Sequence, residues 1–394
     1  MELNRRSFLM ASAAGMAAAN SQTAASAAEN NPTAAPVADG RRPVIDITDL
    51  YHPHQDRGDN FDLIAGYALP EVDLRAVILD VTGRYLRPYF DAANPSYNDP
   101  TGPRSPGYLP VHQLNHIFNR NVPCAPAPFG EMRSPDDDMA DVPAFQQAGV
   151  DLLIETLRKS DEPVDVVSFG SARPLAVALN REPELLERKI RLAHLCVGAY
   201  PAGYVEWNVQ LDVHAFVRVI RSNLKIAVYP CATEKSPFAL GVHNCYWAMD
   251  NLNWVREMAA PLQRYIEFAF TRSNRVDFLN AMDEAEPLAD MKEHYDHAHH
   301  VWETAVWAQV ADRRFISEGG APYRLLPMAS AGPDAKVIEE GLMPCVLEIS
   351  GDGQLTMRET QGATTATLYF RRDPQSYQTA ANQALRELYL GFLR

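Results

Sequence analysis

Short apolar runs alternate with amphipathic segments along most of the chain. The apolar runs have the length of buried strands, and the amphipathic segments repeat their apolar residues at helical spacing. The predicted strands are residues 44–47, 74–81, a part of 186–197, 164–169 and 224–229, and the predicted helices are 61–69, 147–159, 175–179 and 213–220. Such alternation predicts an α/β fold with a mixed, mostly parallel central sheet flanked by helices in Rossmann-like layers.

The second half of the chain is predicted to contain longer helices, followed by a group of strands. Two long stretches, 249–271 and 283–310, are predicted to be helical. Further expected elements are strands at 345–349, 355–358 and 366–370, with "SGDGQ" as a hairpin turn, and a closing helix at 382–393. Stretches 84–111 and 121–143 are rich in Pro, Asn, Asp and Gly and are predicted to be long loops, which are often lids or insertions.

The N-terminus has the pattern of an export signal. Arg5 and Arg6 stand in "NRRSFLM" before an Ala-rich run that is too short and too weakly apolar for a membrane span of about 20 residues. This is typical of a twin-arginine signal peptide. We therefore expect a signal at 1–28, a flexible leader at 29–40, one domain at 41–394, and a periplasmic or secreted protein without stable membrane insertion.

Composition excludes one class of partner. The chain of 394 residues is 46% hydrophobic and 22% charged, as in a globular protein, and its formal net charge is −14. We expect no nucleic-acid partner, because such binding depends on basic patches that neutralise phosphates. The five cysteines form no CxxC pair and stand mostly in apolar runs, which favours buried thiols over a zinc knuckle and leaves disulfide pairing open.

The most informative segment is 44–83, which combines a strand, an acidic turn, an amphipathic helix and a second strand. In a parallel sheet, ligands bind outside the carboxyl ends of strands, where this turn is expected. Carboxylates crowded there repel one another unless a proton or a cation relieves the repulsion. A hard divalent cation would do this, because such cations prefer oxygen ligands. The carboxylates in or beside the turn are Asp46, Asp49, Asp56, Asp59 and Asp62.

Several segments, in the correct order, resemble the inosine-uridine-preferring nucleoside hydrolase family. The first comprises "DITD" at 46–49, "LIAGYALPEV" at 63–72 and "LRAVILDVTG" at 74–83, with "YHPHQDRG" as an insertion. The others are "VDVVSFGSARPLAVALNREPELLERKI" (164–190), "VEWNVQLDVHAFVRVI" (205–220), "VWETAVWAQVADRRF" (301–315) and "LEISGDGQLTMRE" (347–359). The resemblance implies an α/β fold around a calcium ion at the carboxyl ends of strands, a small nucleoside or riboside substrate and a tendency to self-associate.

The resemblance also implies roles for individual residues. Asp49 or Asp46 would be the catalytic base, and Asp49 would also bind the metal. The other metal ligands would be Asp59, Glu303 and a backbone carbonyl near Phe169. The ribose-like end of the substrate would be bound by Glu206 and Asn208. Further expected substrate contacts are Arg84, Trp302 and, from the insertion, His54, with His300 as the acid that protonates the leaving base.

The chain departs from the family pattern at several of these positions. If "TD" at 48–49 is aligned with the family's "TD", Ile47 stands where the first metal aspartate is expected, and only a one-residue shift gives that role to Asp46. The family's Asp-Asp pair becomes Gly58-Asp59. Arg84 replaces an Asn, Trp302 replaces the His before the last ligand, and Glu303 replaces an Asp. These changes predict a metal site of altered geometry or the loss of the metal.

The sequence supports a metal-dependent hydrolase of N-glycosidic bonds. It also allows a sugar- or nucleoside-binding protein without turnover, or a hydrolase of another glycoside. The spacing of His294, His297 and His300 suggests a different metal site on a helix face. Tyr246, Trp247 and Trp254 form either a stacking platform or a core cluster.

Overall fold

The computed structural model describes residues 40–83, 85, 104–362 and 364–393. The expected signal and nearly all of the leader, Arg84 and most of the first predicted loop lie outside these residues. Residues Arg41–Arg394 form one compact unit. Within the part of the chain that is described, no helix is long and apolar enough to cross a membrane.

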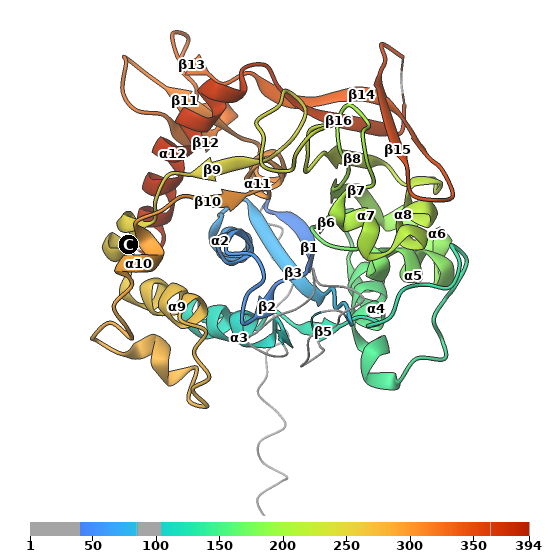
Figure 1. Ribbon diagram of the computed structural model, residues 1–394, viewed down its shortest axis with the longest axis horizontal. Helices are drawn as coiled ribbons and strands as arrows, with labels where there is room; N and C mark the ends of the chain where they lie inside the picture. Colours follow the sequence, from blue (N-terminus) through green and yellow to red (C-terminus); the bar gives the residue numbers. More distant parts are fainter. Residues whose placement is uncertain (1–39, 84, 86–103, 363, 394) are drawn as a thin grey trace, which may run out of the picture. The chain divides into compact units, whose positions relative to one another are not determined.

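A mixed nine-stranded sheet forms the centre of this unit (Figure 1). The strand order is β15-β14-β16-β8-β7-β6-β1-β3-β5, in which β14 is antiparallel to both neighbours and the pairs from β16 to β5 are parallel. The strands are β1 (Arg42–Thr48), β3 (Val72–Leu79), β5 (Cys124–Pro126), β6 (Val164–Ser168), β7 (Ile190–Cys196), β8 (Ile226–Tyr229), β14 (Glu340–Ile349), β15 (Leu355–Glu359) and β16 (Ala366–Arg371). The predicted α/β fold class is confirmed.

The central strands are buried on both faces, which explains their nearly continuous apolar sequences. In β1, Val44 packs into one core, whereas Ile45 and Ile47 pack into the other. Asp46 lies on the Val44 side of this strand, opposite Val77 of β3 and Val167 of β6 in the parallel registers.

Helices cover both faces of the sheet. One core includes the helices α4 (Ala144–Lys159), α5 (Arg173–Arg181), α6 (Pro183–Lys189) and α8 (Val213–Ile220). The other includes α2 (Gly58–Ala68), α3 (Tyr108–Ile117), α9 (Ala260–Phe270), α11 (Thr304–Val310) and α12 (Pro374–Gly391). In Figure 1 the green helices α4 to α8 lie on one side of β1 and β3, and α2, α9 and α12 lie on the other.

The smaller elements surround this frame. The short helices are α7 (Trp207–Leu211), α10 (Lys292–Tyr295) and the 3-10 turns η2 (Asn253–Glu257), η3 (Asn280–Asp283) and η4 (Met328–Ser330). The short strands are β2 (Tyr51–His52), β4 (Ser105–Pro106), β9 (Trp247–Met249), β10 (His299–Val301), β11 (Arg313–Ser317), β12 (Arg324–Pro327) and β13 (Lys336–Val337).

Two sequence predictions of long helices are wrong. The stretch 249–271 contains the end of β9, η2 and α9, and 283–310 contains the end of η3, then α10, β10 and α11. The reason is a long-range pairing, since β9 and β10 form a two-stranded antiparallel sheet with His299 opposite Met249. In addition, Pro261 stands in the first turn of α9 and sets the start of that helix.

Both predicted loops contain regular structure. The described part of 84–111 includes β4 and the start of α3, and 121–143 includes β5 at the edge of the sheet. The predicted hairpin is confirmed, because Ser350 and Gln354 close the turn between β14 and β15.

Candidate active site

A cavity of about 320 Å³ lies at the carboxyl ends of the parallel strands. Its wall includes Asp49 after β1, Phe169 after β6, Cys196 at the end of β7 and Cys231 after β8. This edge is where an α/β sheet binds ligands. The remaining lining residues are Gln55, Asp56, Asp59, Tyr85, Glu206, Trp207, Asn208, Pro237, Phe238, Trp302 and Glu303.

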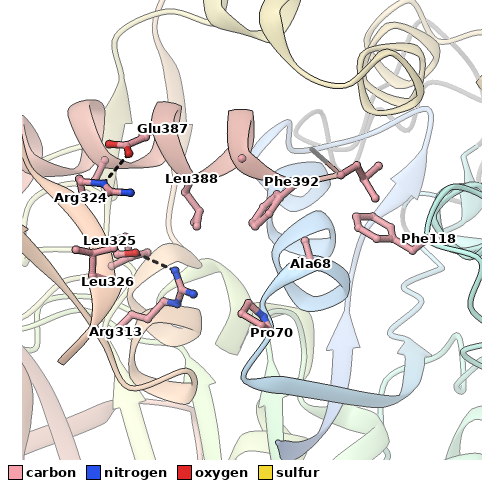
Figure 2. A pocket seen from close by; sticks show the side chains of 13 residues that line it. Ala68, Pro70, Phe118, Arg313, Arg324, Leu325, Leu326, Glu387, Leu388 and Phe392 are labelled. Atoms are coloured by element: carbon pink, nitrogen blue, oxygen red, sulfur yellow. Dashed lines mark hydrogen bonds and ion pairs between the residues drawn. The ribbon is translucent and has the colours of Figure 1, made fainter. Parts of the chain in front are cut away.

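A second hollow, of about 360 Å³, lies between α12, β12 and the end of α2 (Figure 2). Its charged groups are already paired, since Arg324 bonds to Glu387 at 2.6 Å and Arg313 bonds to Glu71 at 3.0 Å. Arg313 also donates to the Leu325 carbonyl. Because these groups satisfy one another, this hollow is a weaker candidate for chemistry than the acidic cavity.

The acidic cavity brings together carboxylates that are distant in sequence. Burial, followed by the charges of Asp56, Asp49 and Glu303, raises the pKa of Asp59 well above its usual range. Burial also raises the pKa of Asp49, and the charges of Asp80 and Asp56 add to this increase. Burial raises the pKa of Glu303 as well, and the charge of Asp56 raises it further. The cavity therefore favours either bound protons or a bound cation.

Two helix starts position Asp59 and Glu303. Asp59 lies in the first turn of α2, and Glu303 is the N-cap residue of α11 without a side-chain capping bond. The two helices contact each other. The Gln55 side-chain amide donates to Asp59 Oδ2 at 2.7 Å and to the Asp49 carbonyl at 2.6 Å, which links the acidic turn to the end of β1.

Glu206 and Asn208 lie at the start of α7 on another wall. Glu206 caps this helix, and its carboxylate accepts from the Asn208 and Gly198 backbone amides at 3.1 and 3.0 Å. Burial raises the Glu206 pKa to about 7. The Asn208 side-chain amide donates to the Phe169 carbonyl at 3.0 Å and to the Cys196 carbonyl at 2.8 Å. Asn208 thus fixes the loop that carries the expected carbonyl ligand.

Aromatic side chains form the wall beside Glu303. The Trp302 indole donates to the Cys231 carbonyl at 2.9 Å, and its ring lies 5.3 Å from Tyr246 and 5.9 Å from Phe238. His300 lies at this rim, 4.6 Å from the Phe238 ring, with Nδ1 2.9 Å from the Tyr246 hydroxyl. Trp247, in contrast, is fully buried and belongs to the core.

Four expected site residues are not among the described residues that line the cavity, and one of them is His300, which lies at its rim. Asp46 is fully buried within β1, where burial raises its pKa to about 8. His54 is buried, and its Nδ1 lies 3.1 Å from the Ala269 carbonyl. Arg84 lies outside the described residues. Asp62 adjoins a small neighbouring hollow that Glu303 also lines, and no hydrogen bond reaches either of its carboxylate oxygens.

The histidine-rich segment does not form the expected helical face. His294 lies in α10, whereas His300 lies in β10, so the segment is divided between two elements. The Arg57 guanidinium contacts His297 Nε2 at 3.0 Å, and His294 and His299 at 3.3 Å each. Three imidazoles therefore surround a cation of the protein itself, while His300 lies at the cavity rim.

The oxygen donors of the cavity fit calcium in type and charge, because Ca²⁺ prefers carboxylate and carbonyl oxygens. The candidate donors are Asp49, Asp59, Glu303 and the Phe169 carbonyl, all within one lining. Across the described ranges, however, no three His, Cys, Asp or Glu side chains already stand at metal-binding positions. The chemistry of the donor set thus fits the ion, and its side chains do not converge on one point.

Sequence reasoning missed several lining residues. Gln55 comes from the insertion, and an amide four residues before Asp59 was the only signal. Phe238 stands in the loop after β8, where an exposed Phe beside Pro237 gave a weak indication. Tyr85 borders the stretch outside the described residues.

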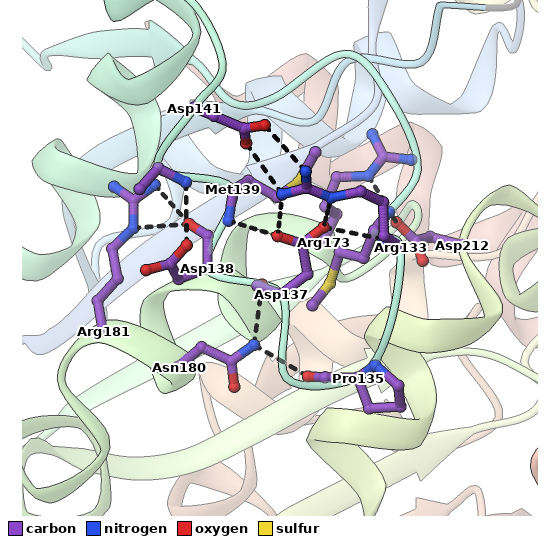
Figure 3. Close-up of polar contacts among 12 residues, drawn as sticks. Arg133, Pro135, Asp137, Asp138, Met139, Asp141, Arg173, Asn180, Arg181 and Asp212 are labelled. Atoms are coloured by element: carbon purple, nitrogen blue, oxygen red, sulfur yellow. Dashed lines mark hydrogen bonds and ion pairs between the residues drawn. The ribbon is translucent and has the colours of Figure 1, made fainter.

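Polar contacts hold the segment 121–143 in place (Figure 3). The Arg173 side chain is fully buried and bonds to Asp212 at 2.7 Å and to the Val81 and Pro128 carbonyls at 2.8 and 2.9 Å. Asp212 also accepts from the Met132 amide at 2.9 Å. These bonds fasten the loop 121–143 to the ends of β3 and α7. The described loop is therefore anchored by polar contacts.

Comparisons with known proteins agree with this geometry. No family model matches the chain. Pyrimidine-specific ribonucleoside hydrolase RihA of Escherichia coli O127:H6 is 33% identical over 93 residues, which are 22% of this chain and 30% of that protein. RihA of Enterobacter sp. strain 638 is 36% identical over 83 residues, 20% of this chain and 26% of that protein. The matches thus span less than a third of these relatives.

The fold comparison extends much further along the chain. The structure of a purine-preferring ribonucleoside hydrolase from Gardnerella vaginalis matches with a TM-score of 0.51 at 12% sequence identity. The match covers 89% of this chain and 99% of the other. At this identity the likeness shows a shared fold alone. The chain is thus similar to nucleoside hydrolases in fold over most of its length, and in sequence over stretches of 93 and 83 residues.

Proposed function

We propose that the protein hydrolyses the N-glycosidic bond of a nucleoside or related riboside at a carboxylate-held calcium ion. One observation carries this proposal. Asp49, Asp59 and Glu303, from three distant segments, line one cavity at the carboxyl edge of the sheet together with Glu206 and Asn208. The relatives' names add ribonucleoside hydrolysis as the reaction class.

The N-glycosidic bond breaks through a transition state with positive charge at the anomeric carbon of the sugar. The carboxylates of the cavity stabilise this charge and so lower the barrier to hydrolysis. A bound calcium ion supplies a site that grips sugar hydroxyls and makes water more acidic. Asp49 would accept the proton of the attacking water, and Asp49, Asp59, Glu303 and the Phe169 carbonyl would hold the ion. Glu206 and Asn208 bind the sugar hydroxyls.

The leaving base departs on the aromatic side of the cavity. Trp302 and Phe238 offer ring faces to a planar base. When the Tyr246 hydroxyl donates to His300 Nδ1, the proton of His300 resides on Nε2, which can donate it to the base. His300 thus replaces the family's histidine, whose position Trp302 occupies.

One observation favours a second function, a riboside-binding protein without turnover. The acidic side chains of the described cavity do not converge on a metal position. Such a cavity can bind sugar hydroxyls through its carboxylates while it lacks an activated water.

The test is the release of free base from a panel of purine and pyrimidine nucleosides by the full chain with calcium. We expect release by the parent protein and its loss in Asp59→Asn, with Asp136→Asn as an exposed control. Nucleoside binding without release by the parent protein would contradict the hydrolase and support the binding protein.

We also propose export by the twin-arginine route, on the basis of Arg5 and Arg6. A double Arg5→Lys, Arg6→Lys variant is expected to remain in the cytoplasmic fraction of an expressing bacterium. Export of this variant at the parent level would contradict the proposal.

A further inference from the structure

One arginine and three histidines that the proposed chemistry does not use form a cluster between the insertion at 51–58 and the histidine-rich segment. The Arg57 guanidinium lies 3.0 Å from His297 Nε2 and 3.3 Å from both His294 Nδ1 and His299 Nδ1. Its Cζ atom lies 5.1 Å from the centre of the Phe270 ring, which adds a cation–π contact. Arg57 and the three histidines form what we name the Arg57 cage.

The contacts determine the protonation state of the cage. A guanidinium has only donors, so each imidazole nitrogen that faces Arg57 accepts a hydrogen bond and carries no proton. In His299 the other nitrogen, Nε2, lies 2.9 Å from the His294 carbonyl and holds the ring's one proton. All three imidazoles are therefore neutral while these contacts exist. A second proton on any of them would place two donors and two positive charges face to face.

The Arg57 cage connects the insertion to the rim of the cavity. We propose that the cage is an acid-sensitive latch, which holds the insertion against β10 at neutral pH and releases it when the imidazoles bind protons. Because β10 carries both His299 and the rim residue His300, release loosens this side of the cavity. The inference goes beyond the proposed function, since it applies to a hydrolase and to a binding protein alike.

The charges around the cage favour release in acid. Burial, followed by the charge of Arg57, lowers the pKa of His299 to about 4 and also lowers the pKa of His294. Arg272 lowers the pKa of His294 further, whereas the exposed Glu293 raises it. The other titratable groups around the cage are Asp56, His54 and His300. The folded state therefore disfavours the added protons, and the latch is complete above about pH 6.5 and is lost as the pH falls toward 4.

Hydrogen exchange of the full chain, measured by mass spectrometry between about pH 7 and pH 4.5 and corrected for the intrinsic exchange rate, tests the latch. Opening returns His299 from a pKa of about 4 to its ordinary value of 6.5. We therefore expect the protection factors of residues 291–301 to fall by about tenfold or more on acidification. The central strands β6 and β7 should keep their protection over the same range.

A variant that cannot take up these protons provides the comparison. His294→Asn, His297→Gln and His299→Asn together keep a side-chain oxygen that can accept from Arg57, but they do not titrate. This triple variant should keep its protection in acid, whereas the control His112→Gln, at an exposed imidazole outside the cage, should lose it as the parent does. If the triple variant does not fold, His299→Asn alone should reduce the loss. Unchanged protection of the parent in acid, or a loss that these variants share in full, would overturn the latch.

Discussion

Asp59 at the start of α2 and Glu303 at the start of α11 line the same cavity, although more than half of the chain separates them. The charge of Glu303 contributes to the raised pKa of Asp59. Two adjoining carboxylates of this kind destabilise the folded chain unless a cation lies between them or a proton is bound. The first prediction follows from this pair.

Removal of calcium should destabilise the parent protein, and Asp59→Asn should largely abolish that effect. Without calcium, Asp59→Asn should be more stable than the parent because one buried like charge is gone. With calcium at 100 times its dissociation constant, the parent should gain about 2.7 kcal/mol and the variant much less. Thermal unfolding with chelator and with calcium measures both effects, and an equal gain in the two proteins would contradict the account.

Asp46 should make stability depend on pH. Its pKa is about 8 in the folded protein against an ordinary value of 3.8, so the folded state holds the proton more tightly. Its contribution to stability is complete below about pH 4 and is lost as the pH rises through 8. Asp46→Asn should reduce the fall in unfolding free energy over this range by about 1.4 kcal/mol per pH unit.

Urea unfolding at a series of pH values tests this prediction. Asp136→Asn, at an exposed carboxylate, is the matched control and should keep the parent slope. An unchanged slope in Asp46→Asn would show that Asp46 ionises as easily in the folded chain as in the unfolded chain.

The buried ion pair of Arg173 and Asp212 should contribute far more to the free energy of unfolding than the exposed ion pairs of Arg133. Arg173→Ala leaves Asp212 uncompensated in the interior and should cost about 3–5 kcal/mol. Arg133 pairs with Asp137 and Asp141 from a side chain that is 65% exposed, so solvent screens these pairs and Arg133→Ala should cost far less stability than Arg173→Ala. Equal losses in urea unfolding would refute this contrast, which Figure 3 displays.

His300 should act on the leaving group alone. His300→Ala should lower kcat for nucleosides by about 10²-fold or more, because their bases require a proton to depart. An aryl riboside with an acidic phenol as its leaving group needs no proton, so its hydrolysis should change little. Tyr246→Phe should have a smaller effect in the same direction. A similar loss on both substrate types would assign His300 to another step.

The central strands could be predicted because each of them is a short, continuous apolar run. The meeting of Asp49, Asp59 and Glu303 in one cavity agrees with the expectation from the family motifs. The pairing of β9 with β10 could not be predicted, since a strand of three residues depends on its partner more than on its own sequence.

The side of the sheet on which Asp46 lies could be determined only from the register of β1. Alternation in β1 turns Asp46 toward the core that contains Val44, whereas Asp49 lies beyond the end of the strand. Proximity in sequence therefore does not place both carboxylates in the cavity. The spacing of the histidines failed for a related reason, because the helical period is interrupted between α10 and β10.

A crystal structure of the full chain with calcium tests the central claim most directly. The account predicts one ion in the acidic cavity, with oxygens of Asp59 and Glu303 at roughly 2.3–2.6 Å from it. An ordered cavity that contains no ion at saturating calcium, or an ion bound only elsewhere, would contradict the claim.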